Sequence, residues 1–212
     1  DYKNQIAIYS GMLAQNFTVQ RSVYNKETGL LLKYVQPLIK ELDVDIITLY
    51  DEKGIVVAQG HQPAGFNIDQ SGLPEVNAAL KGDIITSIVQ EKNDIILQNT
   101  RPIFHDNNPE MVIGAVKVGY IIGDNFAKLL NKSSGANILF LLDGNCFASS
   151  FLNLSSYGGS TCKITKHTHK LQNIEYDIVY ISIATSWSDN LKIAVAIDNT
   201  VMKKTLLWTI SL

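Results

Sequence analysis

The first forty residues place apolar side chains at spacings of three and four, a period typical of an amphipathic α-helix. Gly11 and the KETG stretch at 26–29 weaken this pattern without ending it, and Pro37 indicates a late kink or a restart. We therefore predict one long helix over residues 1–40, which acts as a spine along the fold, a dimer contact, or both. The apolar positions that carry the pattern are Ile6, Tyr9, Met12, Leu13, Phe17, Val19, Val23 and Tyr24.

Beyond this helix the pattern changes to alternating and short apolar runs, which are typical of β-strands. Segments 45–60 and 136–150 share one layout, consisting of a strand, a turn with Asp and Gly, and a second strand. Segments 95–130 and 176–207 each contain a further hairpin followed by a helix. A module of two hairpins and an exit helix therefore occurs twice, and such an internal repeat defines a tandem architecture.

The predicted fold is α+β, with two tandem modules that each contain an antiparallel sheet flanked by helices. Each exit helix follows an apolar strand and is expected to begin near an N-cap residue, Asp124 in the first module and Asp198 in the second. The Ser-Ser-Gly of the NKSSGAN stretch is typical of a linker between the modules. The predicted divisions are a spine helix at 1–40, modules at 41–130 and 131–200, and an exit helix at 201–212.

An insert at 61–83 separates the two hairpins of the first module. It begins as a loop rich in Gly and Pro and continues as a short helix with the sequence LPEVNAALKG. Pro74 suits the first turn of this helix, and Gly82 suits the position after its end. We expect the loop and the short helix to cover one face of the first sheet.

The last residues of the sequence, MKKTLLWTISL, place two lysines before an apolar run. The run Thr205–Leu212 is too short to span a bilayer, which needs about twenty residues. It is either an ordinary C-terminal helix or the first turns of a truncated transmembrane segment. We favour the second, because basic residues beside an apolar run are common at membrane boundaries. A chain that begins with Asp1 also fits a piece of a longer protein.

Composition and net charge indicate a globular protein and argue against nucleic-acid binding. The 212 residues are 46% apolar and 18% charged, as in globular proteins, and a net charge of -2 gives no basic field for a nucleic-acid partner.

Cys146 and Cys162 either form one disulfide in an oxidising compartment or are two unrelated buried thiols. His167 and His169 would share one side of a strand, but no third ligand completes a metal site, so we expect no metal and no cofactor.

The order of elements resembles that of double Cache domains, the tandem PAS-like extracytoplasmic sensors of bacterial and archaeal transmembrane receptors. The resemblance covers essentially the full chain and is closest to the sensory domains that precede histidine kinases. It implies a spine helix rising from one membrane span, an exit helix leading into a second span, a ligand in the membrane-distal first module, and a homodimeric receptor. The segments that carry it are ITLYDEKGIVVAQGHQPAGFNID, LPEVNAALKGD and TRPIFHDNNPEMVIGAVKVGYIIGDNFAKLL. The Arg followed four residues later by Trp that marks the amino-acid-binding branch is missing, since no Trp precedes Trp187.

Lys117 lies in the middle of an apolar strand, VIGAVKVGYIIGD, and is the first candidate site residue. In an alternating strand it shares its face with the small residues Ala115 and Gly119, whereas Val116 and Val118 face the other way. Small neighbours beside a cation leave room for a small molecule. The alternative is that Lys117 lies on a solvent-exposed face of the sheet.

Arg101 lies on the preceding strand in a polar patch with Gln98, Asn99 and Thr100. One hairpin register brings Arg101 to the face of Lys117, and a slip of one residue brings Gln98 and Thr100 there instead. Two cations without an acidic partner predict an anionic ligand such as a carboxylate, which Arg binds with two hydrogen bonds. Alternatively, Arg101 pairs at the surface with Asp83 or Asp94 and contributes little.

His61 and Tyr120 complete the set of candidate ligand contacts. His61 lies in the insert, and loops over a rigid sheet often carry binding groups, although a loop histidine is also commonly just solvated. Tyr120 is close to Lys117 in the sequence, but its position also suits packing in the core. The candidate ligand-binding residues are Arg101, Lys117, Asn99, His61, Gln98 and Tyr120.

The sequence thus predicts the periplasmic or extracellular sensor of a membrane receptor, with a histidine kinase as the output and a small, anionic ligand. Chemoreceptors and diguanylate cyclases use the same kind of input domain, so they remain alternatives. A structural or protein-docking module without a small-molecule ligand is a further alternative. A catalytic role is not expected, because the sequence has no G-x-S-x-G elbow, P-loop, H-E-x-x-H or dinucleotide fingerprint.

Overall fold

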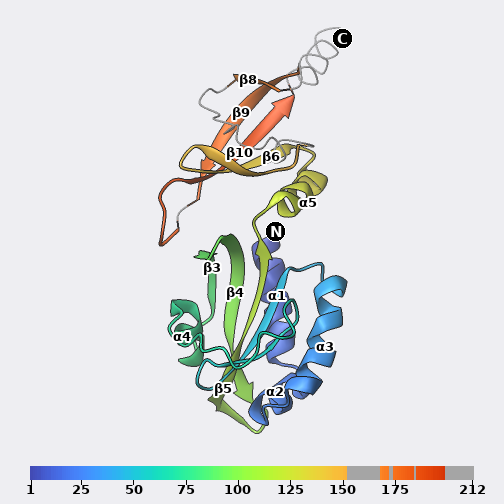
Figure 1. The fold of residues 1–212 in the computed structure, drawn as a ribbon, viewed down its shortest axis with the longest axis vertical. Coiled ribbons are helices and arrows are strands. Elements are labelled where there is room, and N and C mark those ends of the chain that lie inside the picture. Colours follow the sequence, from blue (N-terminus) through green and yellow to red (C-terminus); the bar gives the residue numbers. More distant parts are fainter. Residues whose placement is uncertain (152–167, 172–173, 184, 199–212) are drawn as a thin grey trace. The chain divides into compact units, whose positions relative to one another are not determined.

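The computed structural model describes residues 1–151, 168–171, 174–183 and 185–198 (Figure 1). The chain divides into two compact units, Asp1–Ile121 and Ile122–Leu212, which are called the first and the second module below. Each module contains a five-stranded antiparallel sheet. The α+β fold with two tandem modules, predicted from the sequence, is therefore confirmed.

The N-terminal segment forms three helices in place of the single helix predicted over residues 1–40. They are α1 (Tyr2–Ala14), α2 (Phe17–Tyr24) and α3 (Thr28–Glu41). Asn16 has an extended backbone and its side chain accepts a hydrogen bond from the Val19 amide at 3.1 Å, so it starts a new helix. Lys26 adopts a left-handed φ of 56°, which separates α2 from α3. Pro37 lies inside α3 without ending it.

The first sheet has the strand order β2-β1-β5-β4-β3. Its strands are β1 (Ile46–Asp51), β2 (Val56–Gln59), β3 (Ile85–Glu91), β4 (Asp94–His105) and β5 (Asn108–Ile121). The N-terminal helices pack on one face, where α1 contacts β4 and β5 and α3 contacts β1 and β2. The short helix α4 (Pro74–Leu80) packs on β4 and β5 from the other face, as Figure 1 shows. The sheet is therefore the middle layer of three.

Alternation along the strands gives each face of this sheet its own core. Toward the N-terminal helices, buried residues of the sheet meet buried residues of the helices, and these are Ile47, Leu49, Val116, Val118, Ile6, Leu13, Val19, Val23, Leu31 and Val35. Toward α4, the apolar cluster is smaller and is confined to one end of the sheet. It consists of Tyr50, Val56, Val76, Ala79 and Ala115.

The second module repeats this topology. Its sheet has the order β7-β6-β10-β9-β8, so each strand takes the place of its counterpart in the first sheet, and the predicted repeat is confirmed. The strands are β6 (Asn137–Leu142), β7 (Asn145–Ser149), β8 (Thr168–Leu171), β9 (Ile174–Ser182) and β10 (Leu191–Asp198). A core cluster of Leu139, Leu141, Tyr176, Ile178, Ala194 and Ala196 lies on this sheet.

Helix α5 (Asp124–Ser134) packs on β6 and β7 and belongs to the second module, whereas the sequence analysis had placed it at the end of the first. Its N-cap is Gly123 rather than Asp124. The Asp124 carboxylate instead accepts a hydrogen bond from the Ser149 amide at 2.8 Å, which ties α5 to β7.

Several sequence predictions fall on parts of the chain that the structure does not describe. Residues 199–212, which contain the predicted exit helix, and Cys162 and His167 lie outside the described residues. Cys146 lies on β7 and packs against the core cluster of the second sheet. Among the described residues, no helix is both long enough and apolar enough to cross a bilayer.

Candidate ligand-binding site

A row of polar side chains crosses the first sheet on the face covered by α4. Lys117 on β5 lies directly opposite Thr48 on β1 and Thr100 on β4, and Thr48 in turn lies opposite Gln59 on β2. Residues that face each other across an antiparallel ladder point to the same side of the sheet. The four side chains therefore form one continuous row, and all are buried, with Lys117 only 2% exposed.

A second row runs beside the first. Gln98 on β4 lies opposite Gly119 on β5 and Ser87 on β3, and the Gln98 side chain is fully buried. Its amide nitrogen donates to the Glu75 carboxylate on α4 at 2.8 Å. The polar patch on this face thus extends across all five strands of the first sheet and reaches the helix that covers it.

Buried oxygens of this patch lack hydrogen-bond partners in the described part of the chain. These atoms are Gln59 Oε1, Ser87 Oγ, Gln98 Oε1 and Thr100 Oγ1. A buried polar group without a partner costs about 1–3 kcal/mol, so native proteins satisfy such groups with protein atoms, water or a ligand. Four such oxygens therefore gather on one buried face of the first sheet.

Lys117 pairs with an acidic residue on this face. Its ammonium lies 2.7 Å from Glu91 Oε1, and the Glu91 side chain is 26% exposed. Glu75 adds a second, buried carboxyl group, which forms no salt bridge with any described cation. One cation and two carboxyl groups therefore lie around the polar rows.

The pKa values of neighbouring groups reflect this environment. Burial raises the pKa of Tyr50 well above its ordinary value, and the charges of Glu91 and Glu75 act in the same direction, while Thr48 opposes them. His61 retains contact with solvent, yet partial burial and the charge of Lys117 lower the pKa of its imidazole. His61 thus lies at the rim of the site, in the neighbourhood of Lys117 that the sequence predicted.

The loop at 60–73 folds back beside β2 and reaches the same face. The backbone N–H of Asn67 donates to the Val56 carbonyl at 2.8 Å, and the backbone N–H of Val56 donates to the Ile68 carbonyl at 2.9 Å. The Tyr50 hydroxyl donates to Gln70 Oε1 at 2.8 Å, which connects the loop to the sheet. Loop and helix α4 together form the cover that the sequence predicted for this face.

The sequence analysis expected the small residues Ala115 and Gly119 to leave space for a small molecule beside Lys117. The structure corrects this expectation, because both positions are filled. Ala115 is covered by Val76 and Ala79 of α4. A Cβ on Gly119 would lie 2.8 Å from the Leu97 carbonyl oxygen, so this glycine serves the close approach of β4. The feature that distinguishes this face is its set of unpartnered oxygens.

Arg101 lies on the opposite face of the sheet from Lys117, which decides between the two registers that the sequence left open and removes Arg101 from the set of candidate residues around Lys117. It faces Val116 in the ladder, while Thr100 faces Lys117, so the alternative register is the one that forms. Neither Asp83 nor Asp94 forms a salt bridge with Arg101, and none of the other described carboxylates does. Gln98 is therefore the candidate on β4 that lies with Lys117.

Asn99 and Tyr120 are also turned toward the N-terminal helices and do not belong to the Lys117 face. Asn99 accepts a hydrogen bond from the Ser10 hydroxyl on α1 and donates to Thr86 Oγ1 at 2.8 Å. Tyr120 packs edge-on against Tyr2, with ring centroids 5.4 Å apart. Both residues bind α1 to the sheet, which is a structural role.

Sequence reasoning did not single out several residues of the patch. Thr48 and Gln59 are polar residues within strands that are otherwise apolar, so the same signal that drew attention to Lys117 was available for them. Glu75 and Glu91 gave no such signal, because charged residues at a helix start or a hairpin end are normally solvated. Only the folded chain brings them to the face of Lys117.

The repeated sheet order and the layered first module define a tandem PAS-like fold, the double Cache fold that the sequence resembles. The periplasmic domain of Vibrio cholerae LuxQ has this fold, with a TM-score of 0.66, 13% identity and 94% of each chain covered. The sensor domain of the V. cholerae histidine kinase DctB gives a TM-score of 0.58 at 10% identity, covering 92% of this chain and 90% of that one.

A domain of a sensory box/GGDEF family protein from Vibrio parahaemolyticus also shares the fold. Its TM-score is 0.59 at 13% identity, with 94% of this chain and 90% of that chain covered. No family model matches the sequence, and no curated protein matches it. The likeness is thus one of fold, and it extends over both modules.

Proposed function

We propose that this chain is the extracytoplasmic input domain of a transmembrane signalling receptor, and that it binds a small polar molecule on the Lys117 face of the first module. The observation that carries the proposal is the buried row formed by Gln59, Thr48, Lys117 and Thr100, with its unpartnered oxygens. The fold shared with the LuxQ and DctB sensor domains supports the same role.

The charges on this face favour a ligand that donates hydrogen bonds. The anionic ligand expected from the sequence rested on Arg101 and Lys117 sharing one face without an acidic partner. Arg101 lies on the other face, and Lys117 already pairs with Glu91. Because Glu75 and the amide oxygens of Gln59 and Gln98 are acceptors, a molecule with hydroxyl or ammonium groups matches the site better than a simple anion.

Signalling requires that the ligand bind two states of the domain with unequal affinity. The cover formed by α4 and the loop at 60–73 supplies such a difference, because it contacts the site through Gln70 and Glu75. A ligand that bridges the polar rows to the cover stabilises the closed arrangement. We propose that this closure is the event that the receptor transmits.

The remaining parts of the proposal concern the intact receptor. We propose that it is anchored in the cell membrane, that this domain is periplasmic or extracellular, and that the receptor is a homodimer. A histidine kinase is the proposed output, supported by the DctB likeness. A chemoreceptor or a diguanylate cyclase is the alternative, and the GGDEF protein of similar fold supports the second of these. The domain itself is proposed to be non-catalytic.

A thermal-shift screen tests the proposal. Polyols, amines, amino acids and carboxylates are added to the whole chain, and the melting temperature is recorded for the wild type and for Lys117→Met. A compound with hydroxyl or ammonium groups should raise the wild-type melting temperature, and Lys117→Met should lose that gain. An exposed control, Lys33→Met, should keep it. An unchanged gain in Lys117→Met would reject the assignment and favour a module that docks proteins.

A further inference from the structure

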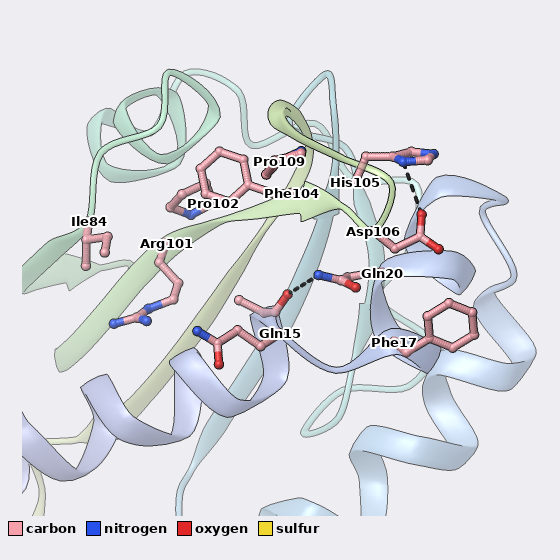
Figure 2. A pocket seen from close by; sticks show the side chains of 11 residues that line it. Gln15, Phe17, Gln20, Ile84, Arg101, Pro102, Phe104, His105, Asp106 and Pro109 are labelled. Carbon is pink, nitrogen blue, oxygen red and sulfur yellow. Dashed lines mark hydrogen bonds and ion pairs between the residues drawn. The ribbon is translucent and has the colours of Figure 1, made fainter.

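A cavity lies beside the face of the first sheet that is opposite Lys117. This cavity, of about 550 Å³, lies between the junction of α1 and α2 and strand β4. Figure 2 shows the Arg101 side chain extending from β4 toward α1, with Gln15, the residue that follows α1, next to it. This volume lies within the range of small-molecule sites, which is roughly 300–1,000 Å³.

The Arg101 guanidinium has no strong partner in the described part of the chain. It forms no salt bridge with a described carboxylate, and its one hydrogen bond runs from Nε to Asn99 Oδ1 at a length of 3.5 Å. Asp106, the acidic residue of the same cavity, lies 3.1 Å from His105. Figure 2 places that pair away from the guanidinium.

Gly11 gives the guanidinium its position. A Cβ on Gly11 would lie 2.7 Å from Arg101 Nη1, closer than real side chains approach. Glycine inside a helix costs about 1 kcal/mol relative to alanine. The chain therefore carries a residue that weakens α1, and its lack of a side chain leaves room for the Arg101 guanidinium to lie close to the helix.

Apolar side chains also line the cavity. Ile84, which precedes β3, and Ala14 of α1 lie among its lining residues, whereas the rings of Pro102 and Phe104 lie on the other side of the β4 ribbon from the Arg101 side chain (Figure 2). Ile84 is 56% exposed, so its side chain is open to contact from an apolar group. A cation beside an apolar wall suits a molecule that has one anionic and one apolar end.

We propose that this cavity is a second binding site, separate from the Lys117 face, for a small carboxylic acid with an apolar group. The two oxygens of the carboxylate accept hydrogen bonds from the Arg101 guanidinium, whose planar fork matches them. The apolar group packs on Ile84 and Ala14. Nothing in this assignment depends on a ligand being bound on the other face.

Titration calorimetry of the whole chain with benzoate, and with benzamide as its uncharged counterpart, tests the proposal. Benzoate should bind saturably, and benzamide should bind at least about tenfold more weakly. Arg101→Gln should weaken benzoate binding about ten- to hundredfold. Arg101→Lys keeps the charge but loses the fork and should also weaken it, which shows that geometry counts as well as charge.

Gly11→Ala provides an independent variant, because its methyl group displaces the guanidinium. It should weaken benzoate binding, while Gly29→Ala, which adds a methyl group to α3 with no atom within 4 Å, should not. Lys33→Gln, which removes an exposed cation, should leave binding within about twofold of the wild type.

Absence of saturable benzoate binding in the wild type, or equal binding by wild type and Arg101→Gln when circular dichroism shows that both are folded, overturns the proposal. Equal displacement by sulfate also overturns it, because that result reveals a general anion contact without a site for the apolar group. Variants of Arg101 test benzoate binding, and the Lys117 variant tests ligand binding on the other face of the sheet. Failure of one assignment therefore leaves the other intact.

Discussion

Thr100 lies directly opposite Lys117 in the ladder between β4 and β5, and both side chains are buried. The next residue of β4, Arg101, lies opposite Val116 and points to the other layer. Because side chains alternate along a strand, this one register decides which cation joins the polar rows and which meets α1. The two cations of this hairpin therefore serve two different faces of one sheet.

The ion pair on the Lys117 face predicts a stability effect. Glu91→Gln removes the carboxylate that lies 2.7 Å from a lysine that is 2% exposed. A buried charge left without its partner is costly, and since Glu91 is partly exposed we expect a loss of about 1–3 kcal/mol in the free energy of unfolding. Urea denaturation measures it.

The matched control for Glu91→Gln is Glu52→Gln. Glu52 pairs with Lys26 at 3.2 Å, but both side chains are nearly half exposed. Its removal should cost less than about 1 kcal/mol. Equal losses in the two variants would mean that the Lys117 pair is no more buried in solution than a surface pair.

A second prediction concerns the close approach of β5 to β1. A Cβ on Gly114 would lie 2.1 Å from the Tyr50 carbonyl oxygen, and backbone atoms cannot move aside as a flexible side chain can. Gly114→Ala should therefore lower the free energy of unfolding by about 3 kcal/mol, by the overpacking of a filled core.

Gly72→Ala is the control for Gly114→Ala, since a Cβ there meets no atom within 4 Å. Its effect should stay within about 0.5 kcal/mol. Thermal unfolding of both variants is sufficient to compare them, and a melting temperature of Gly114→Ala equal to that of the wild type would contradict the strand register described for β1 and β5.

A third prediction follows from Asp51 at the turn between β1 and β2. Burial acts to raise the pKa of its carboxyl, but hydrogen bonds from Lys26, Ile55 and Lys53 outweigh burial and lower the pKa below its ordinary value of 3.8. A carboxyl with a lowered folded-state pKa stabilises the fold above the unfolded value and loses this contribution as the pH falls through the folded one.

Asp51→Asn should therefore destabilise the chain at pH 7 and show a smaller further loss between pH 5 and pH 3, as unfolding at a series of pH values would reveal. Asp83→Asn, at an exposed carboxyl, should leave the pH profile of the wild type unchanged. A profile of Asp51→Asn that runs parallel to that of the wild type would exclude Asp51 as a source of the acid sensitivity.

Much of the fold was predictable because its signals are local. Period-two runs, Asp-Gly turns and Pro74 at a helix start identified the hairpins and α4, and the recurrence of one layout identified the two modules. The break at Asn16 was missed because an apolar period of three and four continues across it, while the capping hydrogen bond to Val19 acts on the backbone. Strand β3 was also missed.

The makeup of the buried polar face was predictable in part. Lys117 and Gln98 were singled out as polar residues within apolar strands, and the insert from its turn residues, and the structure places them on one face of the first sheet. The side of the sheet to which Arg101 points was not predictable. It depends on the register between β4 and β5, and the hydrophobic pattern alone does not decide between two registers that differ by one residue. The partners Glu75 and Glu91 reach Lys117 and Gln98 only through tertiary structure.

The most direct test of the polar row is Thr100→Val, which replaces a buried hydroxyl without a partner by a methyl group of the same shape. The melting temperature of the whole chain is measured with and without the compound that stabilises the wild type most in the screen. We predict that the variant alone is as stable as the wild type or more stable, and that it loses the ligand-induced gain. A less stable variant that keeps the full gain would contradict the assignment of this face as the ligand site.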